Sequence, residues 1–169
     1  MHTDALANHQ RLRFGGSGRL WVPALRAMAL CVVALLGPTG TRAAPLNLSA
    51  YKGKVVYLDF WASWCAPCKL SFPYMERMTA VYSHGSFVVI AVNVDHSRER
   101  ADAFLEQVGA GVPVVYDPKG EIARSFHVAA MPTSVLIGRD GRVRYVHQGF
   151  FQAKTDEYQA HIEELINEK

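Results

Sequence analysis

Residues 55–68 read VVYLDFWASWCAPC, and the interpretation of the whole chain starts from this stretch. Its first half, Val55–Trp61, is a short and nearly continuous run of β-branched and aromatic residues. Such a run predicts a buried central strand. Asp59 interrupts the strand with a carboxylate, and two cysteines, Cys65 and Cys68, follow it closely. The stretch therefore predicts a strand that leads into a pair of thiols separated by two residues.

The residues after the strand show helical spacing. We expect a helix from Cys65 to about Tyr82, opened by the cysteine pair and kinked at Pro73. The apolar residues expected on its inner face are Leu70, Phe72, Met75, Met78 and Val81.

Strands and helices alternate along the rest of the chain. Strands are predicted at residues 87–94, 114–116, 134–137 and 143–148, and helices at residues 98–108, 122–126 and 155–166. Asp95–Ser97 is expected to cap the first of these helices and Thr155 the last. Asp140 and Gly141, between two apolar runs, predict a hairpin. This order predicts an α/β fold whose early strands are parallel and whose last strands are antiparallel.

Composition and charge narrow the class of protein. The chain has 169 residues, of which 50% are hydrophobic and 20% are charged, as in a globular domain. Residues 1–44 hold five arginines and one acidic residue, whereas the remainder holds 13 basic and 14 acidic side chains. A nearly neutral body without a basic cluster argues against binding of nucleic acid.

Residues 1–44 have the pattern of a targeting segment. Arginines precede the apolar run Ala27–Leu36, and small residues follow as far as Ala44, which predicts a secretory signal peptide. The run is shorter than the roughly 20 residues of a membrane-spanning helix, although residues 20–25 extend it. Both cleavage before Ala44 and retention as an N-terminal membrane anchor remain open. In either case we expect residues 45–169 to form one exported domain, periplasmic or otherwise outside the cytoplasm.

The body of the chain keeps only two cysteines, Cys65 and Cys68. A structural disulfide normally closes a longer loop, because its entropic benefit grows with loop length. A structural zinc site needs four ligands and usually a second pair of ligating residues. The histidines of the body are scattered singly and are assigned to surface or loop-end roles: His84, His96, His127, His147 and His161. We therefore predict a redox-active dithiol and no metal site, with an inert disulfide as the alternative.

The two thiols are expected to differ in role. The free N–H groups and the dipole at a helix N-terminus stabilise a thiolate, which makes Cys65 the attacking nucleophile. Cys68, one turn further in, is the resolving thiol that attacks the mixed disulfide and releases the partner.

The sequence WCAPC, after a strand that ends in DFWAS, resembles the thioredoxin superfamily. Met131-Pro132-Thr133 resembles the cis-proline loop of that family, and Gly149 resembles its glycine turn. The segments FWASWCAPC, SFPYM, VVIAVNVD and MPTSVLI are more similar to the exported TlpA/ResA/CcmG group than to cytoplasmic thioredoxin. The resemblance covers about residues 46–169. It implies a thioredoxin-like fold with a central mixed β-sheet flanked by helices and an extra helix and strand at residues 98–116.

The resemblance also implies roles for individual residues. Met131 and Pro132 are expected to form a cis peptide beside the cysteines, to pair with the backbone of a partner as an added strand, and to keep metals off the thiols. Trp64 is expected to form a flat apolar platform beside the sulfur. Ordinary core packing is the alternative for Met131.

Asp59 is a further candidate for the chemistry. A carboxylate in a buried strand loses hydration, so we expect a raised pKa and a role in relaying a proton to or from Cys68. Many TlpA/ResA-like proteins have a glutamate three residues after the second cysteine, where this chain has Ser71. This departure favours Asp59 as the proton shuttle. The alternative is a carboxylate bound to backbone or water without a kinetic role.

The implied function is that of an exported thiol-disulfide oxidoreductase that needs no cofactor beyond its dithiol. The resemblance favours a reductant of disulfides in exported proteins, such as apocytochrome c or a copper-site protein, recharged by a membrane-embedded electron donor. Two alternatives remain open: a dithiol oxidant of exported proteins, and a Cu(I) carrier that uses both thiolates. A peroxidase is disfavoured, because it would need a single cysteine in a polar pocket.

Overall fold

The structure is a computed structural model and describes residues 46–82 and 85–168, so the predicted leader at residues 1–44 lies outside the described residues. The strands are β1 (Val55–Trp61), β2 (Phe87–Asn93), β3 (Val114–Tyr116), β4 (Thr133–Ile137) and β5 (Val143–Gln148). The helices are α1 (Cys68–Val81), α2 (Arg98–Val108), α3 (Glu121–Ser125) and α4 (Thr155–Asn167), with short 3-10 turns η1 (Leu48–Tyr51) and η2 (Gln152–Lys154). The predicted order of strands and helices is confirmed.

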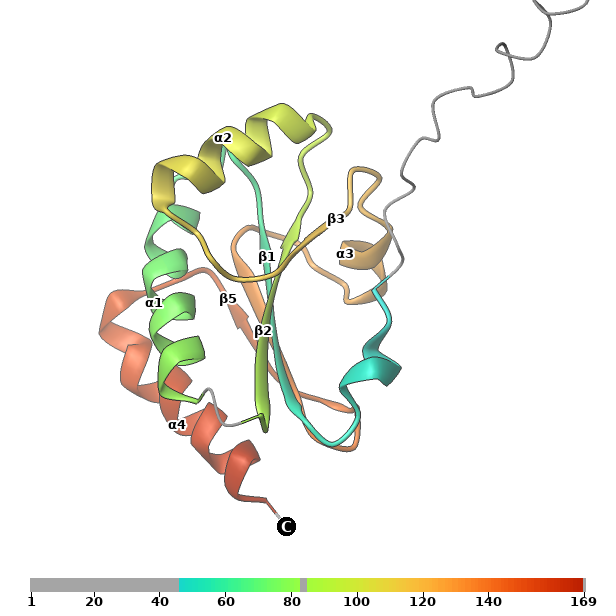
Figure 1. The fold of residues 1–169 in the computed structure, drawn as a ribbon, viewed down its shortest axis with the longest axis vertical. Helices are drawn as coiled ribbons and strands as arrows, with labels where there is room; N and C mark the ends of the chain where they lie inside the picture. Colours follow the sequence, from blue (N-terminus) through green and yellow to red (C-terminus); the bar gives the residue numbers. More distant parts are fainter. Residues whose placement is uncertain (1–45, 83–84, 169) are drawn as a thin grey trace, which may run out of the picture. The chain divides into compact units, whose positions relative to one another are not determined.

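The strands form one mixed sheet in the order β3-β2-β1-β4-β5 (Figure 1). β1 has the predicted bounds, and each of its residues is buried, because it lies in the middle of the sheet. It pairs in parallel with β2 and antiparallel with β4. β3 continues the parallel part beyond β2, and β5 closes the antiparallel hairpin with β4. The predicted α/β architecture with a mixed sheet is therefore confirmed.

The side chains of β1 supply two separate cores, because successive residues of a strand face opposite sides of a sheet. Tyr57 and Trp61 belong to the core under α1, α2 and α4. Leu58 and Phe60 belong to the core on the other face, which η1 and α3 cover. Figure 1 shows α1 and α4 on one side of the sheet and α3 on the other. Asp59 is two residues from both Tyr57 and Trp61 along the strand, so its side chain faces the same side of the sheet as theirs, the side on which α1 lies.

Residues 98–116 form α2 and β3, where the extra helix and strand were expected. Ser97 caps α2 as predicted, because its hydroxyl oxygen accepts a hydrogen bond from the N–H of Arg100 at 3.3 Å. The loop between α2 and β3 is attached to α1, since a carboxylate oxygen of Glu76 accepts the N–H of Val112 at 2.9 Å. The added segment is thus part of the same packed unit as the helix that carries Cys68.

The prediction for α1 was wrong in two respects. The helix begins at Cys68 and not at Cys65. Two residues predicted to be buried are also exposed, since Leu70 is 47% and Val81 is 49% exposed, whereas Phe72 and both methionines are buried as predicted. At 3.6 residues per turn, Leu70 and Val81 lie roughly half a turn away from Cys68, which faces the sheet. Apolar character alone does not reveal the phase of a helix.

Two smaller predictions were also wrong. Thr155 does not cap α4; it is the first residue of that helix, and its hydroxyl donates to the carbonyl of Gln152 at 2.9 Å. The histidines are not all isolated, because His147 on β5 and His161 on α4 place ring nitrogens 3.0 Å apart. Strand and helix bring together residues that are 14 positions apart in the sequence. Within residues 46–82 and 85–168, no helix has the length and apolar character needed to cross a membrane.

Candidate active site

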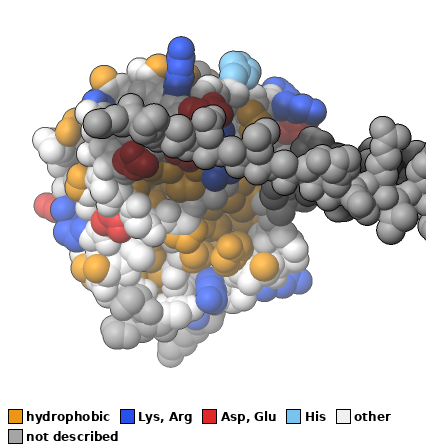
Figure 2. All heavy atoms as spheres, turned by 45° about the horizontal axis from the view of Figure 1, so that its top comes forward, with side chains coloured by type: hydrophobic (Ala, Val, Ile, Leu, Met, Phe, Trp, Pro, Cys, Tyr) orange, Lys and Arg blue, Asp and Glu red, His pale blue; other side chains and the backbone are white. Residues whose placement is uncertain are grey.

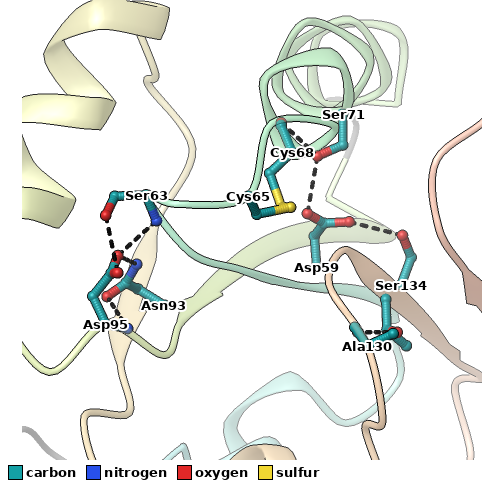
Figure 3. Close-up of a disulfide and its surroundings, with 10 residues drawn as sticks. Asp59, Ser63, Cys65, Cys68, Ser71, Asn93, Asp95, Ala130 and Ser134 are labelled. Carbon is teal, nitrogen blue, oxygen red and sulfur yellow. Dashed lines mark hydrogen bonds between the residues drawn. A yellow bond between two sulfur atoms is a disulfide. The ribbon is translucent and has the colours of Figure 1, made fainter.

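The two cysteines form a disulfide at the start of α1 (Figure 3). The sulfur atoms are 2.11 Å apart, and the two Cα atoms are 5.4 Å apart. Cys65 is 4% exposed and Cys68 is 0% exposed, so a partner approaching from solvent meets Cys65 first. The adjacent Trp64 is 68% exposed. Both cysteines are therefore buried, but only Cys65 keeps any contact with solvent, beside the large exposed side chain of Trp64.

A series of tight turns delivers Cys65 to its position ahead of α1. The N–H of Cys65 donates to the carbonyl of Ala62, and the N–H of Cys68 donates to the carbonyl of Cys65, both at 3.1 Å. These bonds join residues three apart, which is the spacing of a 3-10 turn and not of an α-helix. Pro67, just before the helix, has no N–H to contribute. Regular helix accordingly starts at Cys68, three residues later than the sequence predicts.

Asp95 holds the segment just before Cys65. One of its carboxylate oxygens accepts the N–H of Ser63 at 2.8 Å and the side-chain amide of Asn93 at 2.8 Å. The other accepts the hydroxyl of Ser63 at 3.0 Å. Asp95 is 6% exposed and follows β2, so it fixes the loop that carries Trp64 and Cys65 to the end of a neighbouring strand (Figure 3). Nothing in the sequence pointed to this contact except a carboxylate that follows an apolar strand.

Asp59 lies on β1 beneath the first turns of α1, where Figure 3 shows it between the disulfide and Ser134. It is completely buried. Ser134 on β4 donates a hydrogen bond to one carboxyl oxygen at 2.7 Å, and Ser71 on α1 lies 3.2 Å from the other. Burial raises the pKa of Asp59 from 3.8 to about 7, although the hydrogen bonds of Ser134 and Ser71 lower it in part. The pKa of Asp59 is therefore raised, as the sequence predicts. A carboxyl group with this pKa gains and loses its proton near neutral pH.

The proline loop leads into β4, the strand that pairs with β1. The Met131–Pro132 peptide bond is cis, as the family resemblance implied. The carbonyl of Pro132 accepts the N–H of Gly149 at 2.8 Å, which joins this loop to the end of β5. Gly149 has φ +77°, a backbone conformation that favours glycine, and a Cβ there would lie 3.0 Å from the ring of Phe151. Met131 is half-buried and packs against both cores, which agrees with the core role left open for it.

The described surface has exposed apolar side chains, one of which, Trp64, directly precedes Cys65. Figure 2 turns toward the reader the end of the molecule at which α1 begins, and hydrophobic side chains gather on that face. Trp64 and Phe151 are 68% and 56% exposed, respectively. Among the described residues, no group of three or more His, Cys, Asp or Glu side chains has the arrangement of a metal site.

The Redoxin family matches residues 29–162. The chain belongs to the Redoxin family. Thiol-disulfide oxidoreductase ResA of Geobacillus kaustophilus is 31% identical to it over 119 residues, which cover 70% of this chain and 67% of that relative. ResA of Bacillus subtilis is 36% identical over 104 residues, which cover 62% of this chain and 58% of the relative. The chain therefore spans about three fifths to two thirds of the length of these relatives.

The chain is also similar to solved structures of thiol-disulfide exchange proteins and thioredoxins. A thiol:disulfide interchange protein DsbE from Chlorobium tepidum is 46% identical, with a TM-score of 0.70, and the match covers 72% of this chain and 86% of that one. The exposed lipoprotein thioredoxin Etrx1 from Streptococcus pneumoniae is 33% identical, with a TM-score of 0.58, and the match covers 70% of this chain and 90% of that one. The chain is thus a thioredoxin-like thiol-disulfide oxidoreductase similar to ResA and CcmG.

Proposed function

We propose that this Redoxin-family protein is an exported reductant of disulfides in partner proteins. In the reduced state, the Cys65 thiolate attacks one sulfur of a partner disulfide, and the other partner sulfur leaves as a thiolate. Cys68 then loses its proton and attacks Cys65 in the mixed disulfide. The partner leaves with both sulfurs reduced, and the two electrons it gained come from the Cys65–Cys68 dithiol, which is now a disulfide.

The difference in exposure between the two cysteines carries the assignment of roles. Cys65, the less buried of the two, is the cysteine that a large partner can reach, whereas the fully buried Cys68 is reached only from within the protein. A buried thiol deprotonates reluctantly, because burial disfavours its charged form. Asp59, whose pKa is about 7, is suited to accept that proton as Cys68 becomes a nucleophile and to return it to the leaving partner thiolate. Asp59 thereby keeps the net charge beneath α1 constant while the proton moves.

Partner recognition is assigned to the apolar surface beside Cys65. Trp64 offers an exposed aromatic face, and the backbone at Met131 and Pro132 is proposed to pair with an extended segment of the partner. Such pairing depends on main-chain groups and tolerates different partner sequences. The proposal places the partner disulfide between Trp64 and the proline loop.

The proposed biological role is cytochrome c maturation or copper-site assembly, with a membrane-embedded donor that returns electrons to the dithiol. The names of the relatives, a thiol-disulfide oxidoreductase (ResA) and a thiol:disulfide interchange protein (DsbE), support disulfide exchange as the reaction class. Export is proposed from the leader pattern at residues 1–44. The similarity to an exposed lipoprotein thioredoxin supports it. The proposal of export holds both for a cleaved leader and for a leader that is retained as a membrane anchor.

The decisive test is the reduction potential of the Cys65–Cys68 pair, measured by equilibration against dithiothreitol and glutathione redox buffers. A dedicated reductant is expected to have a potential at or below about −250 mV. A value of about −120 mV would instead identify an oxidant of exported proteins and overturn the proposed direction of electron transfer. Competition for Cu(I) against a colorimetric chelator, with the Cys65→Ser variant as control, distinguishes a copper carrier from either enzyme.

A further inference from the structure

The surroundings of Asp59 contain hydroxyl groups where a buried carboxylate would ordinarily have a cation. Among the described residues, no lysine or arginine forms an ion pair with Asp59. β2 places Ala91 opposite it, β4 places Ser134, and α1 places Ser71. Ser134 lies 75 positions from Asp59 in the sequence, and Ser71 lies 12 positions from it. Each approaches a different oxygen of the carboxyl group.

The bond from Ser134 has a fixed direction. The phenol of Tyr57 donates to the Ser134 hydroxyl oxygen at 2.7 Å, and Ser134 donates its own hydrogen to Asp59 Oδ1 at 2.7 Å. Burial raises the pKa of Tyr57 well above its ordinary value, so the phenol keeps its proton and continues to donate. The other titratable groups beside Tyr57 are the phenols of Tyr74 and Tyr158, and burial also raises the pKa of Tyr74. Oδ1 therefore has a permanent donor.

The bond from Ser71 has no fixed direction. Its hydroxyl carries one hydrogen but lies near two acceptors, Asp59 Oδ2 at 3.2 Å and the backbone carbonyl of Cys68 at 3.0 Å. When Asp59 is ionised, the hydrogen of Ser71 stabilises the carboxylate. When Asp59 is protonated, the acidic proton belongs on Oδ2, because Oδ1 already accepts from Ser134. Oδ2 then donates to Ser71, whose hydrogen is free to turn to the carbonyl of Cys68.

We propose that Ser134 and Ser71 are positioning residues that set how tightly Asp59 holds its proton, and that the Ser71 hydroxyl turns between Asp59 and the Cys68 carbonyl as that proton comes and goes. The idea rests on the proposed function in one respect: Asp59 exchanges a proton during the reaction. A serine at position 71 serves this purpose better than an acidic residue, because a second carboxylate there would face Asp59 and repel it. The hydroxyl adapts to both charge states without a like charge.

The first test titrates the Asp59 carboxyl carbon by ¹³C NMR in the oxidised full-length protein, with the signal identified by its loss in Asp59→Asn. Ser134→Ala is expected to raise the pKa of Asp59 by about one pH unit, equivalent to about 1.4 kcal/mol. Ser71→Ala is expected to raise it by less, because its hydrogen bond is longer and is shared. Tyr57→Phe is expected to raise it least, because it leaves Ser134 free to donate. Unchanged titration in both serine variants would overturn the proposal.

Control variants separate a lost hydroxyl from general damage. Thr79→Val removes another hydroxyl from α1, one that donates to the Met75 carbonyl at 2.9 Å and lies two turns beyond Ser71. It is expected to leave the Asp59 titration at its wild-type midpoint. Ser71→Thr and Ser134→Thr keep a hydroxyl and are expected to restore most of the wild-type titration where alanine does not.

The turning of Ser71 has its own readout, the carbonyl ¹³C shift of Cys68. In the wild-type protein this shift is expected to follow the Asp59 titration, and in Ser71→Ala it is expected to lose most of its pH dependence. An equal response in Ser71→Ala would rule out the switch.

A kinetic measurement keeps this proposal separate from the proposed function. The rate at which the reduced protein reduces oxidised insulin is measured against pH in the same serine variants. If the inflection follows the carboxyl titration, both proposals stand. If the carboxyl titration moves but the inflection does not, the hydroxyl network stands and Asp59 is removed from catalysis.

Discussion

Replacing Asp59 by asparagine should stabilise the oxidised protein above neutral pH. The pKa of Asp59 is about 7 in the folded state against an ordinary value of 3.8, so the folded protein binds this proton more tightly than the unfolded chain does. Between these two values the folded state therefore holds more protons, and its stability falls as the pH rises. Above this window the folded protein carries the whole cost of a buried charge. A difference of about 3 in pKa corresponds to about 4 kcal/mol.

Asparagine avoids this cost because it imitates the protonated acid. Its side-chain oxygen can accept the hydrogen bond that Ser134 now donates to Asp59, and its amide can donate to Ser71. We expect Asp59→Asn to gain up to about 4 kcal/mol of unfolding free energy at pH 9 and almost none at pH 4. Guanidinium unfolding of both oxidised proteins across this pH range measures the difference.

Asp117→Asn is the matched control, because Asp117 is also buried but its two carboxylate oxygens accept the backbone N–H groups of Glu121 and Ala123. Asparagine there loses an acceptor and should destabilise the protein at pH 9. Equal stability of wild type and Asp59→Asn at pH 9, or the same gain at pH 4 as at pH 9, would refute the reasoning.

Three further changes test the site. Asp95→Ala leaves the N–H of Ser63 without its acceptor, so it should cost about 2–4 kcal/mol of unfolding free energy and slow attack by Cys65; unchanged stability in urea would contradict the anchoring role. Trp64→Ala should change stability by less than about 0.5 kcal/mol, because the side chain is largely exposed, but should raise KM for insulin while leaving the rate with a small disulfide almost unchanged. Cys68→Ser should accumulate mixed disulfides with partner proteins on non-reducing gels, whereas Cys65→Ser should accumulate none; the reverse pattern would exchange the two roles.

The parts of the fold that the sequence predicted well depend on neighbours along the chain. The apolar run at residues 55–61 forms β1 with the same bounds, and Ser97 caps α2 as its position before a helical pattern suggested. The spacing of Cys65 and Cys68 brings their sulfurs together within one turn of chain. The raised pKa of Asp59 followed from one fact, a carboxylate in a strand too apolar to be solvated.

The partners of these residues depend on tertiary structure. β4 lies beside β1 although β2 and β3 precede it in sequence, and only this crossover brings Ser134 to Asp59. Likewise, Asp95 meets Ser63 across 32 positions because two parallel strands end at the same edge of the sheet. The phase of α1, which buries Ser71 and exposes Leu70, is set by packing against the sheet.

The sequence by itself determined the order of strands and helices, the cysteine pair and the burial of Asp59, because these follow from local spacing and from runs of apolar residues. Only the tertiary structure decided which hydroxyls surround that acid and which face of α1 packs on the sheet. Hydrogen bonds between side chains require alignment within a few tenths of an ångström, and that alignment comes from the order of strands in the sheet and from the rotation of α1 upon it.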